Sequence, residues 1–157
     1  MAVVSKGLPA GRQGFTLLEL LVVISIIGIL MAIGSVSFST AQKKGRDSRR
    51  MGDMKAIQKA LEECYALDNE YPQTVSPDSS LTCVGGTVTM NLVPDDPKNS
   101  DTDDYIYTYS VDADPATVYC QCVKLENTGA GNASDVGSGG SCNYAADDDY
   151  FCVSNQQ

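Results

Sequence analysis

Residues 15–38 limit the possible folds of this chain more than any other part of the sequence. These 24 residues are all uncharged except Glu19. As a helix with a rise of about 1.5 Å per residue, the segment would reach about 36 Å, enough to cross the hydrocarbon core of a bilayer. A carboxylate inside such a helix costs on the order of 2.5–3.5 kcal/mol, so Glu19 indicates a function that requires a partner.

Two common explanations of an N-terminal apolar segment give Glu19 no role. A secretory signal peptide normally has an apolar region of about 7–15 residues, and this segment is longer, although residues 39–41 have the small side chains of a cleavage site. A plain single-span anchor gains nothing from a buried acid. The acid therefore favours a third explanation.

Residues 14–19 read Gly-Phe-Thr-Leu-Leu-Glu and follow a short basic leader. This motif resembles the class III signal of the type IV pilin and type II secretion pseudopilin superfamily. The resemblance implies that residues 1–14 are a leader peptide. A prepilin peptidase would cleave between Gly14 and Phe15 and methylate the new amino terminus. Glu19 would then be the fifth residue of the mature chain, with a role in filament assembly.

Cleavage would place an amino cation at Phe15, one helical turn before Glu19. In a filament, the Glu19 carboxylate of one subunit could meet the Phe15 amine of its neighbour. Opposite charges attract more strongly at low dielectric, and an unpaired buried charge is penalised. We therefore expect this pair to set the axial register of a helical homopolymer. The resemblance further implies minor pilins or pseudopilins and an inner-membrane assembly platform as partners, with membrane lipid around the subunit before assembly.

Charge is unevenly distributed after the apolar segment. Residues 43–59, the basic collar, carry seven basic and two acidic side chains, whereas 17 acidic residues and two lysines follow from residue 60 onward. Such a collar normally stays in the cytoplasm, but the resemblance and the cysteines favour a head outside it. We expect the collar to contact anionic lipid or a neighbour's acids, or to be a solvated helix face. The acidic head makes nucleic acid a poor partner for an isolated subunit.

The expected location follows from these features. The chain would be a single-pass protein of the bacterial inner or cell membrane with its C-terminal head outside the cytoplasm. After assembly it would belong to a periplasmic or cell-surface filament.

All six cysteines lie beyond the apolar segment, at Cys64, Cys83, Cys120, Cys122, Cys142 and Cys152. An even number of cysteines in an exported head predicts up to three disulfides. Cys120 and Cys122 would lie on one face of a strand, which disfavours a bond between them. We expect Cys142 to pair with Cys152, and Cys64 to tie the helix to the head. A metal cluster is the alternative, although the chain has no CxxC pair and no histidine.

The remaining pattern predicts an α+β, pilin-like fold in which a long N-terminal helix packs on a small antiparallel sheet. Apolar residues recur every three or four positions at Met51, Met54, Ile57, Leu61, Cys64 and Leu67. Tyr71-Pro72 should end the helix near residue 69. Alternating side chains predict strands near residues 87–92, 105–111, 117–125 and 150–153. The "LDN…YP" sequence at residues 67–72 resembles a second signature, typical of major pseudopilins, although Val36 stands where many members have proline.

These patterns divide the chain into four parts. We assign residues 1–14 to the leader, 15–41 to a transmembrane or filament-core helix, 42–70 to an amphipathic helix and 71–157 to an extracytoplasmic head with a glycine- and serine-rich loop at 127–141.

Clustered aspartates form the candidate metal site. Asp95, Asp96, Asp101, Asp103 and Asp104 crowd one loop, and residues 147–149 are three more aspartates. Calcium prefers such oxygen ligands, and the resemblance adds weight because major pseudopilins bind calcium in a C-terminal loop. A solvated acidic surface is the alternative, and no cofactor is required. Tyr105, Tyr107 and Tyr109 could form a binding stripe, but a sheet face packed on the helix explains them better.

The sequence does not indicate an enzyme, because a chain without histidine lacks the usual general base. It predicts a structural subunit of a pilus-like filament, in particular a pseudopilin of a type II protein secretion system. The alternatives are a type IV pilin of a surface pilus for adhesion, motility or DNA uptake, and a membrane-anchored binding module that does not polymerise.

Overall fold

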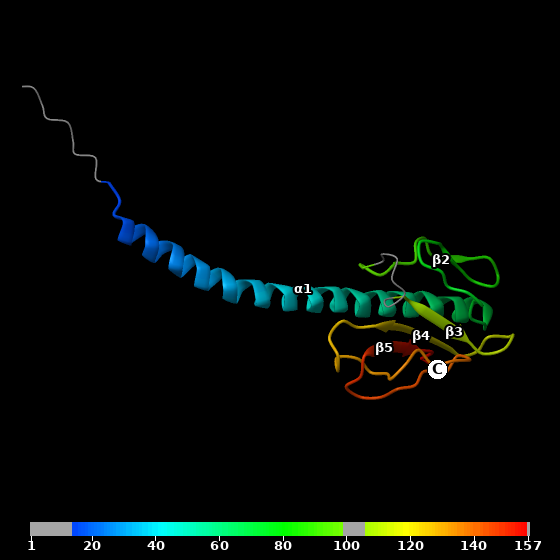
Figure 1. Ribbon diagram of the computed structural model, residues 1–157. Helices are drawn as coiled ribbons and strands as arrows, with labels where there is room; N and C mark the ends of the chain where they lie inside the picture. Colours follow the sequence, from blue (N-terminus) through cyan, green and yellow to red (C-terminus); the bar gives the residue numbers. More distant parts are fainter. Residues whose placement is uncertain (1–13, 99–105, 157) are drawn as a thin grey trace, which may run out of the picture. The chain divides into compact units, whose positions relative to one another are not determined.

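In the computed structural model (Figure 1), the described chain forms one long helix followed by five short strands. The structure describes residues 14–98 and 106–156, without the side chains of residues 34–36. The elements are α1 (Leu17–Asp68), β1 (Leu81–Thr82), β2 (Val88–Met90), β3 (Thr108–Val111), β4 (Tyr119–Lys124) and β5 (Tyr150–Ser154). This order confirms the predicted α+β class, with a long N-terminal helix before small antiparallel sheets.

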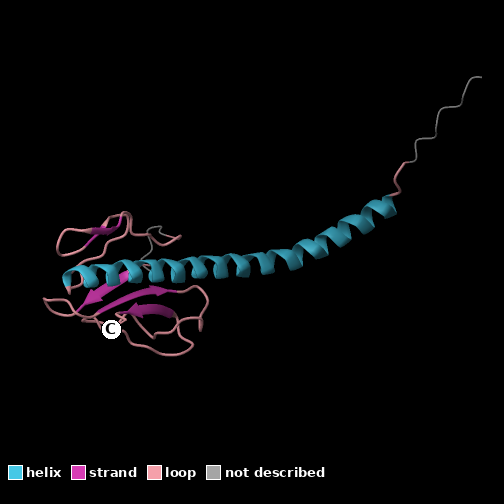
Figure 2. Ribbon diagram, turned by 180° about the vertical axis from the view of Figure 1, so that it is seen from behind, coloured by secondary structure: helices cyan, strands magenta, loops and turns pink. Residues whose placement is uncertain are grey.

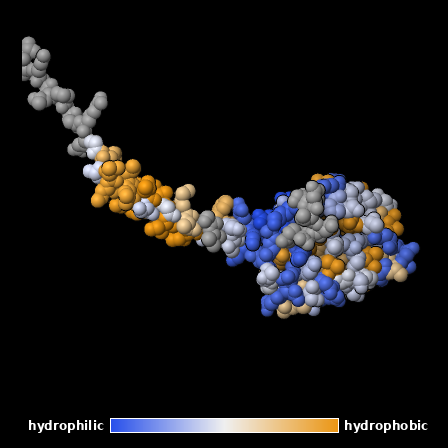
Figure 3. Space-filling model, viewed as in Figure 1, coloured by the Kyte–Doolittle hydropathy of each residue, from blue (hydrophilic) through white to orange (hydrophobic). Residues whose placement is uncertain are grey.

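The chain divides into two compact units, Met1–Ser39 and Thr40–Gln157, and α1 runs from the first into the second. In the first unit, the described apolar side chains of α1 are exposed, as the orange surface in Figure 3 shows. Within the described residues, α1 alone is long and apolar enough to cross a membrane, by length and composition. The predicted limits at residues 14, 41 and 70 stay predictions.

The C-terminal end of α1 lies close to its predicted position. Asn69 adopts a left-handed conformation with φ 55°, and its backbone N–H donates to the Tyr65 carbonyl at 2.8 Å. Asparagine tolerates this conformation, which closes many helices. The Tyr71 N–H then donates to the Ala116 carbonyl at 2.8 Å, so the chain enters the head directly after the helix.

The strands form two antiparallel sheets. β3, β4 and β5 form one sheet with β4 at its centre, and β1 pairs with β2 in a separate hairpin. Figures 1 and 2 show the C-terminal part of α1 between this hairpin and the three-stranded sheet. β2 to β5 overlap the four predicted strands, whereas the two-residue β1 was not predicted because it is too short to show an alternating pattern.

The main core packs α1 against the three-stranded sheet and against the chain around the β1–β2 hairpin. α1 contributes Met54, Ile57, Leu61 and Cys64, and the chain after the helix contributes Tyr71, Leu81, Val93, Tyr107, Tyr119, Val123 and Leu125. The prediction for Leu67 is wrong, because its side chain is 54% exposed. The next residue, Asp68, contacts the turn between β1 and β2, where its Oδ2 accepts a hydrogen bond from the Gly85 N–H at 2.7 Å. Tyr109 also packs against this core, as the sheet-face explanation predicted, and Tyr105 lies outside the described residues.

All six cysteines form disulfides, which join Cys64 to Cys83, Cys120 to Cys142 and Cys122 to Cys152. The first ties α1 to the end of β1, as predicted for Cys64. The predicted Cys142–Cys152 bond is wrong. The register of β4 and β5 places Cys152 directly opposite Cys122, which leaves Cys142 for Cys120.

Candidate functional site

The N-terminus of α1 is built around Glu19. One carboxylate oxygen, Oε2, accepts hydrogen bonds from the Thr16 N–H and the Thr16 hydroxyl, both at 3.2 Å. The Glu19 N–H in turn donates to the Thr16 hydroxyl oxygen at 3.1 Å. This reciprocal arrangement is a capping box, which satisfies two of the backbone N–H groups that a helix start leaves unpaired.

The capping box changes the expectation for Glu19 in the uncleaved chain. With the Gly14–Phe15 peptide bond intact, Phe15 has no amine, and Glu19 bonds to Thr16 instead. The Phe15 side chain is 89% exposed, and no atom lies within 4 Å of a Cβ built on Gly14. Within the described residues, no other part of the chain covers the bond between these two residues. The sequence analysis missed Thr16, although Thr-x-x-Glu before an apolar segment is the usual signature of this cap.

A second constellation, which we call the Arg50 cluster, fixes α1 to the head. The Arg50 side chain is completely buried and bonds to three carboxylates. Its Nε and Nη2 donate to the two oxygens of Asp96 at 2.6 and 2.9 Å. Its Nη1 donates to Asp47 at 2.8 Å and to Glu126 at 3.0 Å.

Two further cations complete the cluster around Glu126. The Arg46 Nε lies 2.5 Å from Oε1 of Glu126, and the Lys98 Nζ lies 3.3 Å from Oε2. The Arg46 hydrogen bond, opposed by burial and supported by Arg50 and Lys98, lowers the pKa of Glu126 to about 2. Burial lowers the pKa of Arg50, but its hydrogen bonds with Asp96, Asp47 and Glu126 more than offset this and raise it above its ordinary value.

The Arg50 cluster corrects part of the sequence analysis. Arg46 and Arg50 belong to the basic collar, which was expected to face lipid, solvent or a neighbour, yet both bond to acids of the same chain. The sequence contained the information needed to predict this. Asp47, Arg50, Met54 and Ile57 follow one another at intervals of three or four residues, so the two charged residues lie on the same helix face as the two apolar ones. A charged pair on the buried face of a helix requires partners from the packed element.

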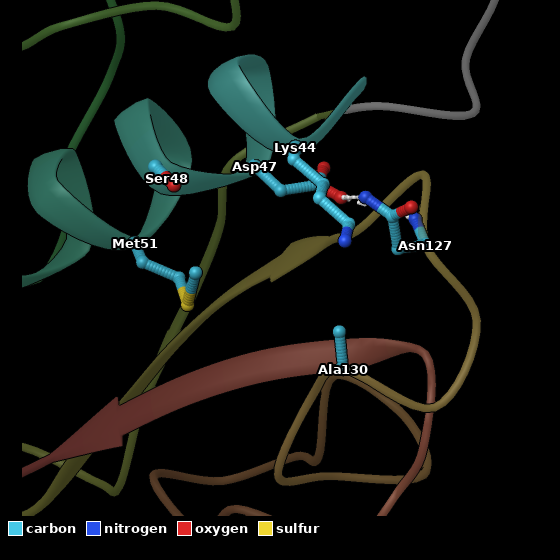
Figure 4. Close-up of a pocket in the computed structure, with 6 residues that line it drawn as sticks. All are labelled: Lys44, Asp47, Ser48, Met51, Asn127 and Ala130. Atoms are coloured by element: carbon cyan, nitrogen blue, oxygen red, sulfur yellow. Dashed lines mark hydrogen bonds between the residues drawn. The ribbon is translucent and has the colours of Figure 1, made fainter. Parts of the chain in front are cut away.

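Beside the cluster lies a pocket of about 290 Å³, drawn in Figure 4. Its lining residues are Lys44, Asp47, Ser48, Met51, Asn127 and Ala130. The Asp47 carboxylate accepts hydrogen bonds from the backbone N–H groups of Glu126 and Asn127 at 2.9 and 3.0 Å. Together with Arg50, these contacts hold the Asp47 side chain in place at the edge of the pocket.

The structure brings together few of the aspartates proposed for calcium. Asp101, Asp103 and Asp104 lie outside the described residues. Both oxygens of Asp96 bond to Arg50, so a calcium ion at Asp96 would compete with a buried guanidinium. Asp95 Oδ1 accepts a hydrogen bond from the Asp96 N–H at 2.7 Å. Calcium binding stays a prediction.

The chemical state of the cysteines argues against the alternative of a metal cluster. The sulfur atoms of Cys120, Cys122, Cys142 and Cys152 lie within 4.8 Å of one another. They are joined in two disulfides, however, and the described chain contains no free cysteine. Metals bind the thiolate form of cysteine, which a disulfide does not provide.

Comparison with known proteins agrees with the N-terminal geometry. The family of the prokaryotic N-terminal methylation motif matches residues 9–35. Type II secretion system core protein G of Pseudomonas aeruginosa is 35% identical over 102 residues, covering 64% of this chain and 67% of that protein. Its Vibrio cholerae counterpart is 28% identical over 139 residues, covering 81% and 91%.

Fimbrial protein Q of Moraxella bovis is 33% identical over 88 residues, covering 52% of this chain and 55% of that protein. The chain thus spans little more than half the length of some relatives that it matches. No solved structure gave a significant match. The methylation motif, the capped helix start with Glu19 and the extended similarity to core protein G agree with one another. The chain belongs to the type IV pilin and type II secretion pseudopilin superfamily.

Proposed function

We propose that this protein is a structural subunit of a pilus-like filament, which a prepilin peptidase cleaves after Gly14 and methylates at Phe15. The observation that carries the proposal is a single acid, Glu19, at the start of a helix whose described apolar side chains up to Phe38 are exposed. Such a surface requires lipid before assembly and other apolar helices after it.

The energetics favour a polymer in which Glu19 has a partner. Moving an apolar helix from lipid into a helix bundle gains little from the hydrophobic effect, because lipid is equally apolar. Helix packing and polar contacts must supply the difference. The Thr16 cap uses one oxygen of Glu19, which leaves the other oxygen for the Phe15 amine of a neighbouring subunit.

Within this class we propose a pseudopilin of a type II protein secretion system. The similarity to core protein G of Vibrio cholerae extends over 91% of that protein and includes the head. The similarity to fimbrial protein Q supports the second candidate, a type IV pilin of a surface pilus. In either case the partners would be the peptidase, further copies of this chain, minor subunits and an assembly platform in the inner membrane.

The proposed function is tested with Glu19→Val. This variant should still insert into the membrane and lose its leader, but sheared filament fractions should contain little or none of it. Glu63→Val, an acid-to-valine change at an exposed position on the same helix, is the matched control and should assemble normally. Filaments of Glu19→Val at the wild-type level would contradict the proposal.

The two filament classes are distinguished by deleting the gene. A pseudopilin deletion should leave exported enzymes inside the cell envelope. A deletion that removes surface fibres while the exported proteins stay unchanged would favour the pilin.

A further inference from the structure

Two lysines form an exposed basic pair on the part of α1 that belongs to the head. Lys55 and Lys59 are both exposed and one helical turn apart. Together with Gln58, Glu62 and Gln156 they line a hollow of about 370 Å³. Like charges one turn apart on a helix repel, and with two lysines against Glu62 the lining of the hollow carries a formal net charge of +1.

Within the described chain, neither Lys55 nor Lys59 forms an ion pair. Among the described residues, the basic side chains in ion pairs are Arg46, Arg49, Arg50 and Lys98. Glu62 lines the hollow, but its carboxylate accepts hydrogen bonds from the hydroxyls of Tyr71 and Tyr119. The lysine pair is therefore available for a partner.

The complementary acids lie in the segment that leads into β5. Several acids of the head bond internally: Asp47, Asp96 and Glu126 in the Arg50 cluster, Asp53 with Tyr107, Asp68 with Gly85, Asp112 with Thr117 and Asp135 with Asn143. Among the described residues, Glu63, Glu70, Asp78 and Asp114 do not, but none of them belongs to a run of three acids. Residues 147–149 are three aspartates in succession that make no ion pair in the described structure, and the Asp148 carboxylate accepts only the Asp149 N–H, at 2.8 Å.

We propose that the Lys55–Lys59 pair is a docking site for a second copy of this chain, whose aspartates at 147–149 enter the hollow. This inference rests on the proposed filament function and assigns one of its contacts between heads. In Figure 1, α1 and the orange segment before β5 lie on opposite sides of the three-stranded sheet. Two different patches on one chain make a head-to-tail contact, and such contacts build open helical polymers when they do not close into a ring.

The test is a charge swap in the full-length chain, measured by immunoblot of sheared filaments. Lys55→Glu with Lys59→Glu should lower the assembled fraction at least about fivefold, because acid would face acid in the contact. Asp147→Lys with Asp149→Lys should have the same effect. The chain that carries all four changes should recover to within about twofold of wild type. Lys124→Glu, which reverses a charge on β4, should assemble normally.

Formation of the Cys64–Cys83 disulfide, checked by peptide mass mapping, shows that each variant has folded. Normal filaments from the lysine variant would overturn the assignment, and so would a folded four-site variant that fails to recover. A lysine variant that loses binding to phosphatidylglycerol vesicles but keeps its filaments would assign the pair to lipid and overturn the proposal. If Glu19→Val abolishes filaments while all charge variants assemble, only the docking site is wrong. If Glu19→Val also assembles normally, the proposed function itself fails.

Discussion

Replacing Arg50 with methionine should destabilise the head more than any other single change to the basic collar. Methionine retains much of the length of arginine but no charge. It would leave Asp96, whose side chain is completely buried in the wild type, without the guanidinium that bonds to both its oxygens. Removing one partner of a buried ion pair costs about 3–5 kcal/mol. We expect a loss of that size in the free energy of unfolding near pH 7.

Urea unfolding of the full chain in detergent micelles, followed by the near-UV circular dichroism of the buried tyrosines, measures this loss. The matched control is Arg49→Met, the preceding residue. Arg49 is 63% exposed and lies 3.9 Å from Asp53, so its removal should change stability by no more than about 0.5 kcal/mol.

The dependence on pH provides an independent check of the cause. In Arg50→Met, acid would protonate the stranded carboxylates and relieve the penalty for burying their charge. The difference between wild type and variant should therefore shrink as the pH falls from 7 to about 3.5. Equal stabilities for Arg50→Met and Arg49→Met, or a difference that grows in acid, would refute the argument.

Three further predictions address other contacts. The stabilisation that Glu126 gives the wild-type head should be complete above pH 4.5, the ordinary pKa of glutamate. On the order of 3 kcal/mol of it should be lost as the pH falls toward 2, because Glu126 has a lowered pKa of about 2 when folded. An acid titration of the urea midpoint checks this, and a flat profile would contradict it. Tyr107→Phe should cost about 1 kcal/mol in urea unfolding, since it removes a partly buried 2.8 Å hydrogen bond to Asp53 of α1. Tyr144→Phe at an exposed position should cost almost nothing, and equal effects of the two changes would argue against a contribution from the Tyr107 bond. Gly131→Ala should lower the thermal midpoint, because the added Cβ would collide with the carbonyl oxygen of Tyr150 in β5. Gly45→Ala on α1 has free space around the added Cβ and should raise the midpoint. The reverse order of the two midpoints would show that the loop around Gly131 is packed differently.

The parts of the fold that follow a simple period could be predicted from sequence. The apolar run of residues 15–38, the helix face at Met54, Ile57 and Leu61, and the stop at Tyr71-Pro72 all depend on local spacing. The same holds for the alternating residues of β4. Local sequence also contained the capping box of Thr16 and Glu19, although the analysis did not identify it.

The remaining features depend on contacts between distant residues. Arg50 and Asp96 are 46 positions apart, and their pairing depends on how the loop before residue 98 folds against α1. The disulfides depend on the register of β4 and β5, which places Cys152 opposite Cys122. The number and spacing of the cysteines do not reveal that register. The short loop between Cys142 and Cys152 therefore suggested the wrong pairing.

The central claim is that Glu19 acts together with an amino terminus created at Phe15. Intact mass spectrometry of the protein purified from its native membrane or filaments tests this claim most directly. We expect a chain that begins at Phe15, carries one N-methyl group and retains three disulfides. A chain that keeps residues 1–14, or one that begins after residue 41, would contradict it.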